Sequence, residues 1–557
     1  MGKTNKLLII HDADNVALAL EDISAGEEFS ALSLTAADAV PAGHKIAITD
    51  IGEGEAVFKY GSPIGHASRD ICKGRHVHVH NLKTNLCDII NYSYQPEHLP
   101  ETAARDEYFP LMQAKDRRQA ENALRSAAIR ASATRKHSEA LALRAQTVAG
   151  SASHSQPVAS ENRSLVQCEY FTGYLRESGD AGIRNEIWVI NTVGCINKVS
   201  ERVAALANER FSGETDGVFA FTHPYGCSQL GDDQAVTQKI LAGLVNHPNA
   251  AGVLVLGLGC ENNLIDRFKP YIGQYNPDRV KFLTLQESKD EIEDSLSFIS
   301  RLVSYSQTYR RQKLPVSKLK IGLNCGGSDG FSGITANPLV GMFSDTLIEY
   351  GGTAILTEVP EMFGAETILM NRCRNERVFE NTVKMINDFK DYFKRYGQTI
   401  YENPSPGNKA GGISTLEEKS LGCIQKGGTN AVTAVLDYGQ KAAVPGLNLL
   451  NGPGNDIVSN TSLTASGAQM ILFTTGRGTP IGSPVPTVKI SSNSRLYSLK
   501  PNWIDFDAGV LLNGESPESL GDDFFKYVIS VASGEAKTKN ELNGYREIAI
   551  FKDGVTL

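Results

Sequence analysis

The sequence predicts an α/β protein whose larger part has mainly parallel sheets and follows a small β-rich N-terminal domain. After Tyr170, apolar runs of four to seven residues each end in a polar, Gly-rich loop and lead into a helical stretch. That order is typical of βα units. The runs are IWVINTV, GVFAFT, GVLVLGL, LKIGLN, TAILTEV, LNLL and MILFTT. Because no segment repeats at a fixed period, we expect α/β layers and not a solenoid.

The chain divides by composition into four parts. Residues 1–95 are predicted to form the β-rich domain, because KLLIIH, HKIAIT, AVFKY and HVHVH alternate with turn-forming segments. Residues 96–165 are rich in Ala, Arg, Ser, Glu and Gln, which predicts a low-complexity linker, partly helical or disordered. The remainder is expected to form a first α/β part, 166–312, and a second, 313–557.

Composition excludes several classes of partner. A net charge of -8 gives no basic face for nucleic acid. No apolar stretch approaches the roughly 18 residues that cross a bilayer, and the first apolar run is too short for an export signal. Nine cysteines without a C-x-x-C pair indicate free thiols in a reducing, cytoplasmic compartment. We expect a small-molecule ligand, and a homo-oligomer is left open.

Cysteines follow the predicted strands, at the edge where open α/β sheets bind ligands. The first three runs lead to Gly194-Cys195, HPYGC (223–227) and GCEN (259–262), and the fourth leads to CGGSD (325–329). Thiolates beside His or Glu are ligands for iron or zinc. The predicted metal ligands, assembled in space, are Cys195, Cys227, Cys260, Glu261 and Cys325. The alternative is that each cysteine packs as a small hydrophobe.

Acid and base candidates follow the second and fifth runs. Glu358, Glu361 and Glu366 come after TAILTEV, and Glu417-Glu418-Lys419 lies further along. A Glu or Lys with a shifted pKa can remove a proton beside a carboxylate. The predicted catalytic residues are His223, Glu358 and Lys419. For Glu417 to Lys419 the alternative is a solvated helix face.

Glycine-dense loops and histidines supply the binding candidates. GPGND (452–456) and TTGRGTPIG (474–482) can bind an anion through backbone N–H groups, and they match no nucleotide fingerprint, so no nucleotide is expected. His76, His78 and His80 alternate and therefore share one face of a strand, which a solvent-facing edge would also explain. For His11 and His44 the alternative is local turn bonding. The predicted substrate-binding residues are His11, His44, His78, His80, Ser328, Asp329, Asn337, Lys409 and Arg477.

Long segments resemble one known family. In the N-terminal domain they are HDADNVALAL, GHKIAITDI, KYGSPIGHA and HVHVHNLKTNL. Beyond it they include HPYGCSQLGDD, LGLGCENN, CGGSDGFSGITANP, TEVPEMFGAE, YENPSPGNKAGGISTLEEKSLG and FTTGRGTP. On these residues the chain resembles the altronate and galactarate dehydratases, which include the sulfolactate sulfo-lyases. The resemblance implies a β-clip-like SAF domain at the N-terminus, and the chain departs from the family in its longer linker.

The resemblance also implies an activity. It is elimination of water from D-altronate to 2-dehydro-3-deoxy-D-gluconate in hexuronate breakdown, with Fe²⁺ as cofactor and Mn²⁺ as a replacement. HPYGCSQLGDD, TEVPEMFGAE and HVHVHN favour altronate over galactarate. The thiols with His223 or Glu261 would hold or flank the metal, and Lys419, Glu358 or His223 would serve as base or acid.

Two rival interpretations remain. A sulfo-lyase would share the proton removal and differ in the leaving group, although such enzymes carry the two regions on separate chains. A non-catalytic sugar-acid-binding protein would lack the acid, base and thiol positions, which this sequence retains.

Overall fold

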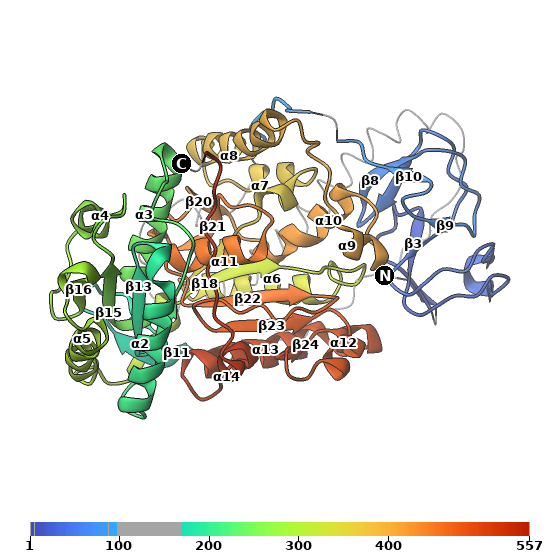
Figure 1. Cartoon of the computed structure of the whole chain (residues 1–557). Helices are drawn as coiled ribbons and strands as arrows, with labels where there is room; N and C mark the ends of the chain where they lie inside the picture. The colour runs from blue at the N-terminus through green and yellow to red at the C-terminus, as the bar shows by residue number, and fades with distance from the viewer. Residues whose placement is uncertain (1, 5, 87, 97–168, 556–557) are drawn as a thin grey trace.

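The computed structural model describes residues 2–4, 6–86, 88–96 and 169–555. The N-terminal domain lies at one end of the molecule, a seven-stranded sheet lies in the middle, and a four-stranded sheet lies at the other end (Figure 1). Apart from Pro96, the predicted linker at 96–165 lies outside the described residues. A β-rich domain followed by a larger region with parallel sheets is the predicted fold class, which is confirmed.

The N-terminal domain consists of short antiparallel strands. Its five-stranded sheet has the order β1-β2-β3-β6-β9, from Gly2–Thr4, Leu7–Ile9, Val16–Ala19, Lys45–Ala47 and His76–Val77. A second sheet has the order β10-β8-β7, from Leu82–Lys83, Ser62–Ala67 and Ala56–Lys59, and β4 (Glu28–Phe29) pairs with β5 (Leu34–Thr35). The four runs predicted as strands all lie in these sheets. Leu7, Ile46 and Val57 are fully buried, so the domain has its own core.

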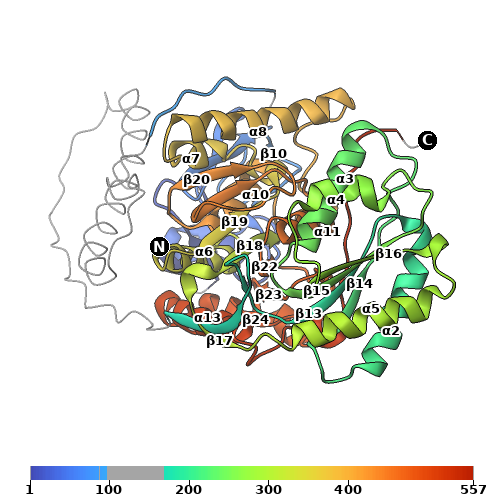
Figure 2. The same ribbon diagram turned by 90° about the vertical axis from the view of Figure 1, so that its left-hand side faces the viewer.

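The four-stranded sheet is parallel, with the order β14-β13-β15-β16. Its strands are β13 (Glu186–Asn191), β14 (Val218–Phe221), β15 (Ala250–Gly257) and β16 (Val280–Thr284). Helices α2 (Asn197–Arg210) and α5 (Glu291–Ser306) cover one face, and α3 (Gly231–Val245) and α4 (Ile265–Ile272) cover the other (Figure 2). Because both faces are covered, the central strands are continuous apolar runs. A small antiparallel sheet of β11 (Tyr170–Leu175), β12 (Ala181–Gly182) and β17 (Gln312–Pro315) lies beside it.

The seven-stranded sheet is also parallel, with the order β20-β21-β19-β18-β22-β23-β24. The strands are Val432–Leu436, Gly446–Leu450, Thr353–Leu356, Lys320–Cys325, Met470–Thr475, Thr487–Ser491 and Phe506–Asp507. Its helices are α6 (Ala336–Glu349), α7 (Glu366–Asn371), α8 (Glu376–Arg395), α9 (Pro406–Ala410), α10 (Leu416–Cys423), α11 (Asp456–Ala465), α12 (Ser494–Leu499), α13 (Pro517–Ala532) and α14 (Lys539–Asn543). Among these helices and the others described, none is both long and apolar enough to cross a membrane.

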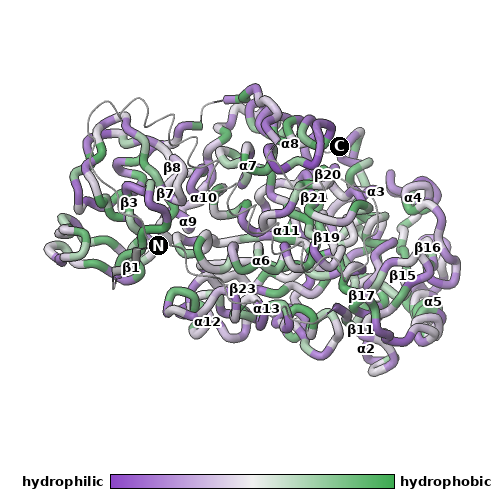
Figure 3. Tube along the Cα trace, turned by 180° about the vertical axis from the view of Figure 1, so that it is seen from behind, coloured by the Kyte–Doolittle hydropathy of each residue, from purple (hydrophilic) through white to green (hydrophobic). Residues whose placement is uncertain are grey.

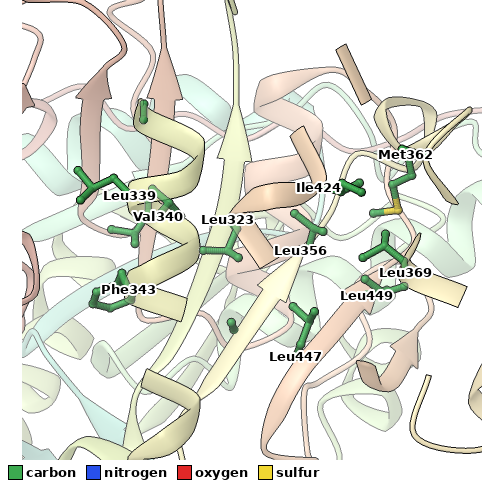
Figure 4. Packing of buried hydrophobic residues seen from close by; sticks show 14 of the residues in the cluster. Leu323, Leu339, Val340, Phe343, Leu356, Met362, Leu369, Ile424, Leu447 and Leu449 are labelled. Atoms are coloured by element: carbon green, nitrogen blue, oxygen red, sulfur yellow. The ribbon is translucent and has the colours of Figure 1, made fainter. Parts of the chain in front are cut away.

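Leucines from the sheet and from α6 form the main core (Figure 4). Leu323 of β18 and Leu447 of β21 are fully buried, and Phe343 of α6 is 2% exposed. Burying such side chains contributes about 1.5–3 kcal/mol each. Figure 3 shows hydrophobic segments among the strands and helices in the middle of the molecule, with hydrophilic segments frequent at its periphery. The core therefore fixes the positions of β18 and its neighbouring strands, including the edge of the sheet formed by their carboxyl ends.

Helices α3 and α11 join the two parallel sheets. A Cβ on Gly243 of α3 would lie 2.5 Å from the carbonyl oxygen of Ala465 on α11, so only glycine permits this approach. One hydrophobic cluster runs across the joint, from Trp188 of the four-stranded sheet to Phe473 of the seven-stranded sheet. The two sheets therefore share a core and are fixed relative to one another.

Candidate active site

Thiols and carboxylates gather beyond the carboxyl ends of β18 and β19. Cys325 is the last residue of β18, Glu361 lies in the 3₁₀ turn Val359–Met362 after β19, and Cys423 ends α10. Glu361 Oε2 lies 3.1 Å from Cys325 Sγ and 3.2 Å from Cys423 Sγ, and the two sulfurs are 3.4 Å apart. β18 lies between β19 and β22 in the middle of the sheet, the region where open parallel sheets bind ligands.

Helix α10 brings charged side chains into this buried region. The Thr415 side chain caps it by accepting a hydrogen bond from the backbone N–H of Glu418. Glu417, Glu418 and Lys419 are all buried, so the alternative of a solvated helix face is wrong. Lys419 Nζ donates to Glu361 Oε1 at 2.6 Å and to Asn403 Oδ1 at 3.0 Å.

Two lysines balance part of the negative charge. Burial alone would lower the pKa of Lys419, but the Glu361 carboxylate outweighs it and the pKa lies above its ordinary value. Lys426 Nζ lies 2.8 Å from Cys325 Sγ. Burial opposes the charged form of Lys426 as well, and the two thiols and nearby carboxylates raise its pKa. Both lysines are therefore ammonium donors at neutral pH.

Two further carboxyl groups have raised pKa values. Burial, then the charges of Glu361 and Cys325, raise the pKa of Glu358 well above its ordinary value. Glu358 has a φ of 69°, a left-handed conformation that is strained for a side chain of its size. Burial and Glu361 raise the pKa of Asp456, at the start of α11, to about 7. A Cβ on Gly326 would lie 2.3 Å from Asp456 Oδ2, so glycine is required for this carboxylate to reach the strand end.

A cavity of about 480 Å³ opens beside this cluster. Its lining includes Cys325, Glu361, Lys409, Lys419 and Asp456. The volume lies within the roughly 300–1,000 Å³ typical of small-molecule sites. The exposed Arg477 lies nearby, with its Cβ 3.2 Å from the position a Cβ on Gly327 would take, and Gly327 also lines the cavity. The cavity therefore combines cationic donors with carboxylates, which suits a small acid carrying hydroxyl groups.

Cys325, Glu361 and Cys423 also form a group able to hold a metal ion. All three are buried, and their ligand atoms lie within 4.8 Å of one another. Two thiolates on one ion are separated by at most about 4.6 Å, twice a metal–sulfur bond of about 2.3 Å, and the observed sulfurs satisfy this limit. Two sulfurs and one carboxylate oxygen suit a first-row transition metal. Of the three, only Cys325 is a predicted metal ligand.

The N-terminal domain reaches the same region. Lys45 and Lys59 each place Nζ 2.8 Å from a carboxylate oxygen of Glu418 on α10, with all three side chains buried. Lys59 also lines a second, small cavity of about 10 Å³ together with Ser328 and Lys419. Ser328 Oγ is buried and has no hydrogen-bond partner among the described residues. This space is about the size of one water molecule.

The histidines lie around the contact between the N-terminal domain and the loop before α10. His44 Nδ1 is 3.0 Å from His76 Nε2, and His78 Nδ1 is 2.9 Å from Ser414 Oγ. Burial lowers the pKa of His76 to about 4 and that of His78 to about 3, so both are neutral. His80 is exposed beside His76. None of these imidazoles is among the residues lining the 480 Å³ cavity.

Three of the predicted binding residues hold the protein's own loops. His11 Nδ1 accepts from the backbone N–H of Ala13, a local turn. Asp329 accepts hydrogen bonds from the side chains of Ser332, Ser492 and Asn493. Asn337 donates to the Gly422 carbonyl and accepts from Thr474 Oγ1 at 2.7 Å. Of the predicted set, Lys409 lines the 480 Å³ cavity, and Ser328, Asp329 and Asn337 line the small one.

The structure does not bring the four predicted cysteines together. Cys195, Cys227 and Cys260 are exposed and follow strands of the four-stranded sheet, whereas Cys325 is buried at the other sheet. Glu261 accepts hydrogen bonds from Thr192 Oγ1 and from the backbone N–H groups of Leu258 and Gly259.

His223 also belongs to the four-stranded sheet. Its Nε2 lies 2.9 Å from the Asn191 carbonyl and its Nδ1 accepts from the Tyr225 N–H. Burial lowers its pKa, so the ring is neutral. Among the described residues, His223 forms no hydrogen bond with Glu358 or Lys419, the other two catalytic candidates, and it does not line the 480 Å³ cavity.

A parallel-sheet region with a buried acid–base and thiol cluster, covered by a small β domain, is the architecture of an enzyme that acts on a small molecule. The chain belongs to the altronate/galactarate dehydratase family. The matching family models are the D-galactarate/altronate dehydratase C-terminal domain at 316–556, the D-galactarate dehydratase/altronate hydrolase second domain at 173–307, and the altronate/galactarate dehydratase SAF domain at 5–85.

Three relatives show how the chain stands within this family. Altronate dehydratase of Bacillus subtilis (strain 168) is 48% identical over 98% of this chain and 99% of its own. Altronate dehydratase of Escherichia coli (strain K12) is 47% identical over 98% of this chain and 99% of its own. Galactarate dehydratase (L-threo-forming) of Escherichia coli (strain K12) is 29% identical over 97% of this chain and 96% of its own.

Proposed function

We propose that the protein is a hydro-lyase that removes water from D-altronate to give 2-dehydro-3-deoxy-D-gluconate, in hexuronate catabolism in the cytoplasm. The observation that carries this proposal is identity of 48% and 47% to two altronate dehydratases over almost the whole chain. Identity to a galactarate dehydratase over a similar length is 29%, which favours altronate as the substrate.

The lining of the 480 Å³ cavity supplies the groups that an elimination needs. The substrate carboxylate binds the ammonium of Lys409, and Arg477 approaches from the rim. Asp456 removes the proton from C2, because its carboxylate lies in the cavity wall and its pKa of about 7 allows it to accept and release a proton.

Lys419 donates the proton with which the C3 hydroxyl leaves as water. It faces the cavity and remains an ammonium group through its pair with Glu361. The C2 proton is then on Asp456 and passes to Lys419, which resets the site. The enol product becomes the 2-oxo acid by taking a proton at C3 from solvent while its C2 hydroxyl releases one. The pKa of Glu358, behind Cys325, is raised well above its ordinary value by burial and by the charges of Glu361 and Cys325, which favours the neutral acid and limits the negative charge of the cluster.

Iron fits the remaining donors. We propose that Cys325, Glu361 and Cys423 hold Fe²⁺, with Mn²⁺ as a replacement, since their ligand atoms are close enough for one ion. When bound, the ion supplies Lewis-acid stabilisation of the charge that develops on the substrate. The ammonium group of Lys426, 2.8 Å from Cys325 Sγ, balances the negative charge of the Cys325 thiolate.

The test is substrate discrimination by the intact chain. The protein is purified anaerobically, supplied with Fe²⁺, and assayed for 2-oxo-3-deoxy products from D-altronate and galactarate, and for sulfite from sulfolactate. We expect turnover of D-altronate to exceed that of the other two. Turnover of sulfolactate alone would support the sulfo-lyase instead, and binding of D-altronate without turnover would support the non-catalytic protein.

A further inference from the structure

Three thiols with no part in the elimination lie at the carboxyl edge of the four-stranded sheet. They are Cys195, Cys227 and Cys260, each preceded by a glycine and each following a different strand of the three neighbours β14, β13 and β15. All three are exposed. Free cysteine is among the most often buried residue types, so three exposed thiols at one sheet edge are unusual.

Hydrogen bonds lock the three thiol-bearing loops into one rim. The Gly194 N–H donates to the Tyr225 carbonyl at 2.8 Å, which joins the first loop to the second. Asn263 joins the third loop to both others, because its backbone N–H donates to Gly226 O and its Nδ2 to Thr192 O, each at 3.0 Å. The thiols are therefore carried by a rigid frame.

The glycine before each of two cysteines is required by close backbone contact. A Cβ on Gly226 would lie 1.9 Å from Thr192 O, and Gly226 has a φ of +95°. A Cβ on Gly194 would lie 2.7 Å from His223 O. In the third loop, Glu261 holds the turn by accepting from Gly259 N at 2.6 Å and from Thr192 Oγ1 at 2.6 Å. His223 and Glu261 thus support the rim.

The spacing of the thiols favours a centre larger than one ion. Among the described residues, these three sulfurs do not form a group within 4.8 Å, whereas thiolates on one ion are at most about 4.6 Å apart. Neighbouring strands lie about 4.8 Å apart, so loops from three adjacent strands begin within about 10 Å. An iron–sulfur cluster is larger than one ion and takes thiolate ligands.

We propose that Cys195, Cys227 and Cys260 bind an iron–sulfur cluster, separate from the Cys325 site. Three protein thiolates on a four-iron cluster leave one iron without a cysteine ligand and free for an oxygen ligand. Gln286 Nε2 lies 3.5 Å from Cys260 Sγ, and such hydrogen bonds to sulfur tune cluster potentials. Backbone contacts, the Asn263 amide and the Glu261 carboxylate hold the rim in place.

The experiment measures inorganic sulfide, which is independent of altronate turnover. The full chain is purified anaerobically, incubated with Fe²⁺ and sulfide, desalted, and analysed for iron, acid-labile sulfide, visible absorption and the electron paramagnetic resonance of the reduced protein. We expect about four sulfides per chain in the wild type, as in a [4Fe–4S] cluster. Cys195→Ser, Cys227→Ser and Cys260→Ser should each lower labile sulfide at least fivefold.

Two control variants separate this site from the others. Cys72→Ser removes an exposed thiol of the N-terminal domain, and Cys325→Ser removes a ligand of the elimination site; both should keep the wild-type sulfide content. Circular dichroism spectra and thermal melting curves check that each variant folds. In the protein loaded with the cluster, Cys195, Cys227 and Cys260 should be protected from thiol alkylation. A wild type without labile sulfide, or rim variants that match Cys72→Ser, would overturn the proposal.

Discussion

Asp456 contacts the strand end only because residue 326 is glycine, which leaves room for its carboxylate at the wall of the cavity. We predict that Asp456→Asn lowers kcat with D-altronate by about 10²–10⁴-fold with little change in KM, because the amide keeps the shape but cannot accept the C2 proton. Steady-state kinetics check this, with Asp522→Asn on α13 as a control expected to match the wild type. Retention of kcat within twofold would remove Asp456 from the mechanism.

Lys419 supports both charge balance and proton donation. Lys419→Met should lower the free energy of unfolding by about 3–5 kcal/mol, because the buried Glu361 carboxylate loses its 2.6 Å partner. Lys419→Arg keeps the positive charge, so we expect most of the stability to return while kcat stays at least 100-fold below the wild type. Urea unfolding and kinetics measure the two effects separately, and full activity of the arginine variant would show that only the charge matters.

Several site residues could not be predicted because their roles depend on contacts across the fold. Glu358 and Cys325 are recognisable from their positions after apolar runs. Cys423 ends a helix 98 residues beyond Cys325, and only the packing of α10 against the turn after β19 brings their sulfurs within 3.4 Å. Asp456 stands in a Gly-rich loop that indicates anion binding, and nothing local shows that burial raises its pKa.

At the scale of elements, α10 connects the N-terminal domain to the site through Glu418. Burial disfavours the charged form of Glu418, but the positive charges of Lys45 and Lys59 outweigh burial and lower the pKa of Glu418 to about 2. Because folding lowers the pKa of this carboxyl group, its charge stabilises the folded state at pH values above 4.5, the ordinary pKa. This contribution is lost as the pH falls from 4.5 towards 2.

We therefore predict that Glu418→Gln lowers the free energy of unfolding by about 3 kcal/mol at pH 7. The difference from the wild type should shrink between pH 4.5 and 2, and urea titrations across this range measure it. Glu380→Gln, on the exposed face of α8, is the matched control and should change stability by less than about 0.5 kcal/mol at any pH. A pH-independent effect of Glu418→Gln would contradict the ion-pair explanation.

Elements with long apolar runs were predictable, and shorter or mixed ones were not. All seven predicted runs are parallel strands, because strands covered on both faces need continuous apolar sequence. The four strands of the parallel sheets that were not predicted lack a long, wholly apolar run. β16 and β20 are partly exposed edge strands, β23 carries Lys489 within a buried run, and β24 has two residues. The split of the strands between two sheets, which separates Cys195 from Cys325, has no local sequence marker.

At the scale of the whole molecule, the N-terminal domain is joined to the rest by side-chain contacts as well as by the chain. Besides the Glu418 pairs, Thr84 and Asn85 bind Glu417, and Tyr94 OH donates to the Cys373 carbonyl at 2.7 Å. We predict that residues 1–96 and 169–557, expressed as two chains, copurify and recover at least a tenth of the turnover of D-altronate. Lys59→Met in the shorter chain should weaken copurification, and failure of the unaltered pair to associate would show that the covalent connection is required.

The glycine contact between α3 and α11 bears on how the protein moves during turnover. Helices that touch at backbone distance, with a shared core on both sides, cannot slide without opening a void, so the two sheets are expected to behave as a single body on the timescale of catalysis. We expect entry and release of the substrate to depend on the segment 402–409, which lines the cavity, or on displacement of the N-terminal domain. Amide hydrogen exchange should be slowest in β18 and β15, and substrate should slow it most in 402–409.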